Sequence, residues 1–227
     1  MSKLQWDTAG NHLFETGVDR GVLYSYTPSP ASGHKMYEDA VAWNGLTAFN
    51  ESPDGGDAND IYADNIKYLS LRGTENFKFS IEAYTYPDEF AQYNGEASLL
   101  DGKMVVAGQG RPTFGFSCRT RVGNDASGSD YGYKIHLVYG VTCSPSDRSY
   151  ETVNDSPDAI NFSWDCETVP YPAFTAGGVD YKATAHIIVD CTKLTQVQID
   201  TLENALYGTN GTDGYLPTPE ELFGLYA

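Results

Sequence analysis

The sequence RPTFGFSCRTRVGNDASGSDYGYKIHLVYGVTC (residues 111–143) is the strongest structural signal in the chain. It contains two runs rich in aromatic and β-branched residues, 111–123 and 131–143, on either side of the turn-rich GNDASGSD. Such runs favour strands, and Gly, Asn, Asp and Ser between them favour a turn. The stretch therefore predicts an antiparallel hairpin with a long loop.

Other segments carry the same kind of signal. In residues 75–87, apolar and polar side chains alternate, with Phe77, Phe79, Ile81 and Ala83 set against Lys78, Ser80 and Glu82. This period of two is typical of a half-buried strand. Further strands are predicted at 21–26, 37–49, 61–73, 159–170 and 181–191, with the last two forming a second antiparallel pair. Trp43 and Trp164 lie in such runs and are assigned to the core, because large aromatics supply much of a sandwich core.

One helix is well signalled near the C-terminus. Thr195 and Gln198 fit a capping box, and Gly208 is placed to end the helix. Its expected apolar stripe is Leu194, Val197, Leu202, Ala205 and Leu206. A shorter helix is predicted at 87–93. The chain is therefore expected to be mainly β, a β-sandwich or barrel with one packed helix and a C-terminal helix, folded as a single domain over 1–227.

Charge and composition exclude several function classes. The 227 residues include 14 Lys and Arg against 31 Asp and Glu, a net charge of −17. Such an acidic chain is a poor match for nucleic-acid or anionic-membrane binding, which needs clustered cations. The N-terminus lacks the apolar core of a signal peptide, so we expect folding in a reducing cytoplasm.

The four cysteines (Cys118, Cys143, Cys166 and Cys191) are too widely spaced for a CxxC motif. We expect four reduced, mostly buried thiols, since two disulfides would need an oxidising compartment.

The sequence contains none of the common catalytic motifs: there is no GxSxG elbow, Walker loop or GxGxxG fingerprint. His136 and His186 alternate with apolar residues in predicted strands and are assigned to strand faces, because no second ligand type lies at metal spacing. The acidic segments 51–65 and 124–130 do not follow the calcium-loop pattern and are interpreted as solvated loops. No catalytic, cofactor-binding or metal-binding residue is predicted.

Many collinear segments resemble the major tail protein of long-tailed bacteriophages (siphophages), the tail tube subunit. They are W-D-x-A-G at 6–10, FETGVDRGVLY (14–24), AWNGLTAFNESP (42–53), YADNIKYLSL (62–71), IEAYTYPDEFAQ (81–92), FGFSCRTRVGND (114–125), YGYKIHLVYG (131–140), SPSDRSYETVNDSPDAINFSW (144–164), LENALYG (202–208) and LPTPEELF (216–223). The resemblance runs essentially end to end, with departures expected in loops around 27–36, 94–110 and 171–180.

This resemblance implies a fold and an assembly. The fold is the tail tube type of β-sandwich, with an N-terminal arm at about 1–18, a long loop at about 51–64, and a C-terminal helix plus tail at about 194–227. The assembly is a stack of hexameric rings around a lumen that conducts the DNA genome into the host. Partners would be further copies of the chain together with the tape measure, tail terminator and distal tail proteins. The product would belong to the virion tail, assembled in the bacterial host cytoplasm, with no enzyme activity and no cofactor.

Physical reasoning agrees with that expectation. An acidic bore would repel phosphate and let DNA slide, and sheet edges can pair with neighbours in a ring. We expect Asp54, Asp57 and Asp60 to reach cations such as Arg119 or Arg121 on a neighbouring subunit. Terminal contacts are expected from Leu4, Trp6, Leu222 and Phe223, although docking of these ends on their own domain is an equal alternative.

Two other functions share this composition. A β-sandwich carbohydrate-binding or adhesion module would use aromatic residues as a sugar platform and stay monomeric. A glycoside hydrolase would bring two carboxylates together in a cleft. Self-assembly separates the tail subunit from both.

Overall fold

The computed structural model describes residues 3–4, 6–73, 75–100, 103–146, 148, 150, 152 and 159–226. Its strands are β1 (Leu13–Tyr26), β2 (Tyr37–Trp43), β3 (Leu46–Glu51), β4 (Asp54–Gly55), β5 (Ala58–Ala63), β6 (Ile66–Arg72), β7 (Glu75–Asn76), β8 (Lys78–Ala83), β9 (Glu96–Leu99), β10 (Met104–Ala107), β11 (Phe114–Asn124), β12 (Gly128–Cys143), β13 (Phe162–Thr168), β14 (Phe174–Ala176), β15 (Val179–Tyr181) and β16 (His186–Asp190). The helices are α1 (Gln196–Tyr207) and α2 (Pro219–Gly224), with short 3-10 turns η1 (Asp88–Gln92) and η2 (Cys191–Lys193). The chain is mainly β, as predicted.

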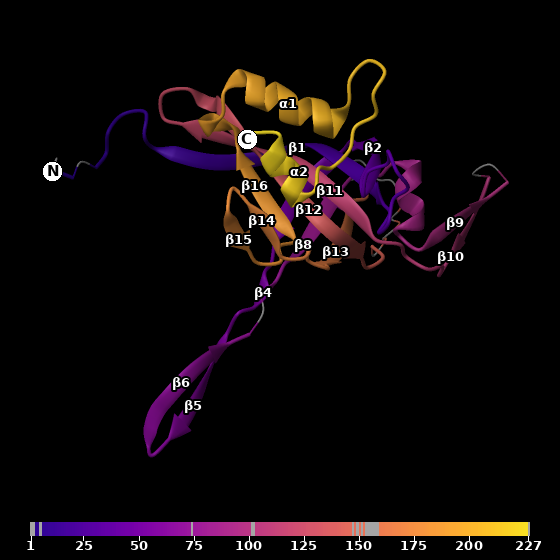
Figure 1. Cartoon of the computed structure of the whole chain (residues 1–227). Coiled ribbons are helices and arrows are strands. Elements are labelled where there is room, and N and C mark those ends of the chain that lie inside the picture. The colour runs from indigo at the N-terminus through magenta and orange to yellow at the C-terminus, as the bar shows by residue number, and fades with distance from the viewer. Residues whose placement is uncertain are drawn as a thin grey trace.

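One antiparallel sheet forms the body. Its strands follow the order β2-β1-β11-β12-β13-β8-β3, and β16 pairs with β12 beside β13. β2 and β3 are consecutive in the chain but stand at opposite ends of this order, so the sheet curls back on itself. The helix α1 covers the outer face of the curl, and thin hairpins project from the body in different directions (Figure 1).

The central strands are buried on both faces. In β12, Ile135, Leu137 and Tyr139 pack towards α1, and Val138 packs into the interior of the curled sheet. This explains why residues 131–143 read as a nearly continuous apolar run. The predicted hairpin of β11 and β12 is confirmed, with a loop of only Asp125–Ser127 between the strands.

The interior of the curl is aromatic. Trp43 and Trp164 are 2% and 0% exposed and meet edge to face at 5.4 Å between ring centres. Their predicted place in the core is confirmed. In β8 the inward residues Phe79, Ile81 and Ala83 are buried, which confirms the alternation seen in the sequence.

Helix α1 begins and ends where the sequence predicts. Thr195 and Gln198 form the capping box, and Gly208 has φ +77° at the C-terminus. The buried stripe is Ile199, Leu202, Ala205 and Leu206. Val197 is 74% exposed, so its assignment to the stripe was wrong: it falls on the solvent side of the first turn.

Two local predictions require correction. Residues 51–64 are not a loop, and 61–73 is not one strand: both belong to a hairpin of β5 and β6 that turns at Asp64 and Asn65, where φ is +50° and +64°. Two consecutive left-handed residues make the tight turn that suits a twisted hairpin. The regions expected to be loops at 94–110 and 171–180 also contain hairpins, β9–β10 and β14–β15.

The strands predicted at 159–170 and 181–191 do not pair with each other. Both β13 and β16 pair with β12 instead, β16 along Lys134–Val138 and β13 along Val141–Cys143. The change of partner occurs at Gly140, which has φ +62° and lies so close to Val169 that a Cβ would stand 2.1 Å from its carbonyl oxygen. Only glycine fits this bend, which lets one long strand serve two partners on the same edge.

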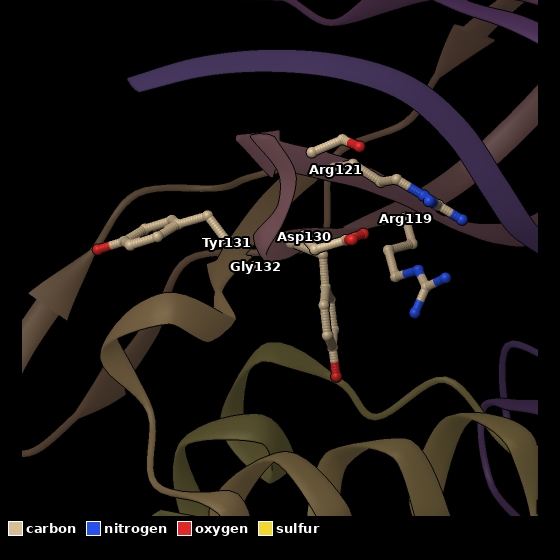
Figure 2. A pocket seen from close by; sticks show the side chains of 7 residues that line it. Arg119, Arg121, Asp130, Tyr131 and Gly132 are labelled. Carbon is tan, nitrogen blue, oxygen red and sulfur yellow. The ribbon is translucent and has the colours of Figure 1, made fainter. Parts of the chain in front are cut away.

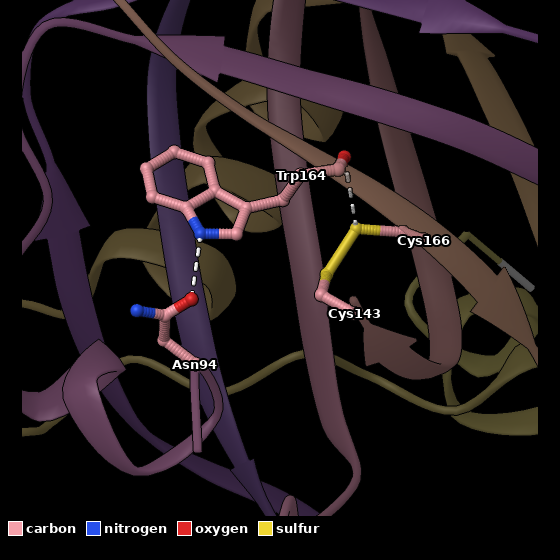
Figure 3. The surroundings of a disulfide bond; sticks show 4 residues. All are labelled: Asn94, Cys143, Trp164 and Cys166. Atoms are coloured by element: carbon pink, nitrogen blue, oxygen red, sulfur yellow. Dashed lines mark hydrogen bonds between the residues drawn. A yellow bond between two sulfur atoms is a disulfide. The ribbon is translucent and has the colours of Figure 1, made fainter. Parts of the chain in front are cut away.

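The expectation of four reduced thiols is wrong for one pair. Cys143 and Cys166 face each other across β12 and β13 and form a disulfide, with Cα atoms 4.1 Å apart. It lies beside Trp164, whose indole N–H donates to Asn94 (Figure 3). Cys118 and Cys191 are free and buried, as expected.

The described residues contain no helix that combines the length and hydrophobicity needed to cross a membrane.

Candidate functional site: assembly surfaces and a histidine–carboxylate cluster

A long hairpin, here called the arm (residues 54–76, β4 to β7), extends far from the body (Figure 1). Most of its residues are exposed, and six large apolar side chains lie 36–67% exposed: Ile61, Tyr62, Ile66, Tyr68, Leu69 and Leu71. An isolated two-stranded ribbon has no core of its own and is at best marginally stable in water. The arm therefore presents apolar surface that its own chain does not cover.

The arm has an apolar face and a polar face. Ile61 pairs with Leu69, and after a bulge Tyr62 pairs with Lys67 and Ala63 with Ile66. Residues paired across the two strands lie on the same face, and successive residues of one strand alternate between faces. The bulge adds one residue, Tyr68, to β6, so that Ile66 lies on the same face as Ile61 and Leu69.

Leu71 joins the apolar face, two residues beyond Leu69. The opposite face carries Asp60, Lys67 and Ser70 together with the exposed Tyr62. Asp60 accepts a hydrogen bond from Ser70 at 2.7 Å and pairs with Lys67 at 2.7 Å. These contacts, Lys67 first, lower the pKa of Asp60.

The acidic residues predicted to contact a neighbour lie in or near this arm. Asp54 and Asp57 are exposed, and Asp54 pairs with Lys78 at 3.1 Å at the root of the arm. Two of the three predicted carboxylates, those of Asp54 and Asp60, are thus already paired within their own chain. The acidic segment 51–65 is therefore not the solvated loop that the sequence predicts, because Lys67 and Lys78 reach its carboxylates through the hairpin fold.

Arg119 and Arg121 lie on β11 and both bind Asp19 of β1. Arg119 donates to the two carboxylate oxygens at 2.5 and 2.8 Å, and Arg121 donates to Oδ2 at 3.2 and 3.3 Å. Hydrogen bonding from Arg119 is the main cause of the lowered pKa of Asp19. Both arginines thus have a partner inside the subunit, and the single carboxylate of Asp19 offsets one of their two positive charges.

An open hollow of about 350 Å³ lies beside these arginines, lined also by residues 129–133. Figure 2 shows Arg119 and Arg121 extending to one side of it while Tyr131 points away. The Arg119 guanidinium stands 4.8 Å from the ring centre of Tyr133 and is only 14% exposed, so Arg121, at 49%, is the more accessible cation.

The predicted terminal residues divide into exposed and buried ones. Leu4 and Trp6 are 73% and 75% exposed. Leu222 is 7% exposed and belongs to the cluster under α1, so its assignment to a subunit interface was wrong: α2 docks on its own domain. Phe223 on the same helix remains 44% exposed.

The β9–β10 hairpin is a second projecting ribbon with exposed apolar residues. Leu99, Leu100, Met104, Val105 and Val106 are 41–67% exposed. It leaves the body on a different side from the arm (Figure 1). The sequence does not reveal this hairpin, because a ribbon exposed on both faces shows no apolar–polar alternation.

The structure also brings together three side chains that sequence analysis treated as unrelated. His136 Nδ1 lies 3.1 Å from His186 Nε2 and 3.3 Å from Glu51 Oε1, and the last two atoms are 4.0 Å apart. The two histidines are diagonal neighbours on β12 and β16, and Glu51 comes from the end of β3 across the interior. The expectation that no second ligand type lies near these histidines was wrong, because the pairing of β16 with β12 is not visible in the sequence.

Burial governs the protonation of this cluster. It lowers the pKa of His136, and it lowers that of His186 to about 3 with a further contribution from His136. Both imidazoles are therefore neutral at ordinary pH. The pKa of Glu51 is raised by burial and by the nearby Glu15.

No family model matches the chain, and no curated protein matches it in sequence. Several solved structures are similar in shape. A chain of the anti-feeding prophage baseplate is 8% identical, with a TM-score of 0.36, over 84% of this chain and 100% of that one. A chain of an extracellular contractile injection system sheath–tube complex is 12% identical, with a TM-score of 0.34, over 75% of this chain and 88% of that one. A type six secretion system protein is also 12% identical, with a TM-score of 0.34, over 74% and 91%.

Proposed function

We propose that this chain is the tail tube subunit of a long-tailed bacteriophage, in which six copies form a ring and rings stack into a tube that conducts DNA. The sequence resemblance described above motivates the proposal, and the observation that carries it is the projecting arm with one apolar face. A ribbon of this kind needs a partner surface, and a second copy of the chain is the partner that a tube supplies.

The proposed interface has an apolar centre and a charged rim. Ile61, Ile66, Leu69 and Leu71 form the centre on the arm, and Leu4, Trp6 and Phe223 extend it from the chain ends. Asp54, Asp57, Asp60, Arg119 and Arg121 form the rim, where ion pairs can exchange between subunits with little net change in free energy. This division follows the usual anatomy of protein interfaces.

The net charge of −17 supports the proposed conduit. DNA that must pass through a tube should not bind its wall, and binding would require clustered Lys and Arg. Acidic subunits repel phosphate over about 8–10 Å at ordinary salt. Tape measure, tail terminator and distal tail proteins are the expected partners at the ends and inside the tube, and assembly would take place in the host cytoplasm.

The test is self-assembly of the full chain. Concentrated protein should form six-fold rings or tubes in negative-stain electron microscopy, and these should not retain short duplex DNA at low salt. A variant in which residues 53–76 are replaced by a short Gly-rich turn should remain a folded monomer, because the Ser52 N–H still bonds to the Lys78 carbonyl at the root.

Two results would contradict the proposal. Tubes formed equally well without the arm would remove the arm from assembly. A chain that stays monomeric at every concentration and binds glycans would instead favour the carbohydrate-binding module.

A further inference from the structure

The Glu51–His136–His186 cluster has the dimensions of a metal site. A tetrahedral zinc ion binds imidazole nitrogen and carboxylate oxygen at about 2.0–2.2 Å, which places neighbouring ligand atoms about 3.3 Å apart. The three ligand atoms here are separated by 3.1, 3.3 and 4.0 Å. Each side chain offers one such atom, and the three atoms all lie within 4.8 Å of one another.

The ligand chemistry is also suitable. Two imidazoles and one carboxylate are typical of zinc and of related divalent transition metals. On the far side of the His136 ring, Nε2 lies 3.0 Å from Thr120 Oγ1. When Nε2 donates its proton there, the lone pair of Nδ1 faces His186 and Glu51. Such a bond on the second ring nitrogen fixes the orientation of a metal-binding histidine.

The surroundings hold the rings in place and leave one side open. Phe77 stacks on His186 at 4.3 Å between ring centres, and Phe49 lies 5.5 Å from His136. The histidine side chains are 5% and 11% exposed, and Glu51 is 38% exposed. An ion can therefore enter past Glu51, and water can fill the fourth position.

The neighbouring charges do not oppose a cation. Lys134 lies two residues before His136 on β12, but its ammonium group is bound to Glu15. The carboxylate of Glu15 thus offsets the nearest positive charge, and Glu51 supplies a further negative one.

We propose that Glu51, His136 and His186 bind a divalent transition metal ion, with Zn²⁺ the best match, and that the ion fastens the root of the arm to the sheet. The arm leaves the body between β3 and β8. Glu51 is the last residue of β3, and Phe77 immediately precedes β8. Glu51, three residues before the arm begins, would ligate the ion, and Phe77, the residue directly after the arm, packs on the ligand His186. The ion would therefore restrain the chain on both sides of the root. The inference concerns the isolated subunit and does not depend on the proposed function.

The experiment is a calorimetric titration of the untagged full chain with ZnCl₂, after any bound metal has been removed with EDTA. We expect saturable binding of one ion per chain, at least tenfold weaker in Glu51→Gln and in His186→Gln. The surface pair of His34 and Glu38, whose atoms lie 3.1 Å apart without a second imidazole, supplies the matched control. The double variant H34Q/E38Q should bind zinc as the wild type does.

A second measurement tests the effect on the arm. Amide hydrogen exchange at residues 49–52 and 77–80 should slow when zinc is added to the wild type, and should not respond in Glu51→Gln. Glu51 is partly exposed, so this variant keeps the proposal testable even if His186→Gln fails to fold. Absence of saturable binding, or binding that Glu51→Gln leaves unchanged while H34Q/E38Q abolishes it, would overturn the proposal and mean that the histidines are only a hydrogen-bonded pair.

Discussion

At the scale of single residues, Asp19 joins β1 to β11 through side-chain ion pairs. Its carboxylate binds two arginines, Arg119 and Arg121, and the first of them is only 14% exposed. Asp19→Asn keeps the shape but removes the charge, and should lower the free energy of unfolding by about 2 kcal/mol at neutral pH, as expected for hydrogen bonds to charged groups. Urea denaturation of both proteins measures this difference.

The pH dependence of that difference follows from the direction of the pKa shift. The pKa of Asp19 is lower in the folded chain than in the unfolded chain. Its contribution is therefore complete above the unfolded pKa and is lost as the pH falls through the folded one. The difference in the free energy of unfolding between the wild type and Asp19→Asn should therefore disappear at acidic pH. A gap that stays constant with pH would show that shape, not charge, accounts for the effect.

The sequence could not predict contacts between residues that are far apart in the chain and meet only in the fold. Cys143 and Cys166 meet because they are register partners on β12 and β13, and His136 meets His186 because β16 pairs with β12. Neither pairing leaves a mark in local sequence. The capping box at Thr195, by contrast, depends only on residues three apart, and was predictable.

At the scale of elements, strands with one buried face were predictable and exposed ribbons were not. The alternation in β8 reflects burial of one face, and the apolar run in β12 reflects burial of both faces. Both strands were therefore predictable from the sequence. The arm has its apolar face in solvent in the single chain, and its bulge at Tyr68 breaks the period of two. The apolar face of the arm therefore could not be predicted without knowing how the residues of β5 pair with those of β6.

The two faces of the arm make a sharp test of its role. Leu69→Lys places a charge on the apolar face, whereas Ser70→Lys places the same charge one residue away on the polar face. Because an unpaired charge is costly in an apolar interface, Leu69→Lys should raise the concentration needed for self-association at least tenfold, and Ser70→Lys should change it little. Light scattering over a concentration series measures both. Equal effects of the two substitutions would mean that the added charge, and not loss of the apolar face, weakens self-association.

At the scale of the whole molecule, the charge of −17 opposes the association that the apolar surfaces favour. Repulsion between like-charged subunits is screened over about 30 Å at 0.01 M salt and about 8 Å at 0.15 M. Apolar contacts are not weakened in this way. Raising NaCl over that range should therefore lower the concentration at which the full chain assembles, and KCl should act identically. Leu69→Lys should need a higher concentration than the wild type at every NaCl concentration, because screening does not restore the lost contact. Assembly that instead weakens with salt would assign the main role to ion pairs between subunits, with the Asp54, Asp57 and Asp60 carboxylates as the first candidates.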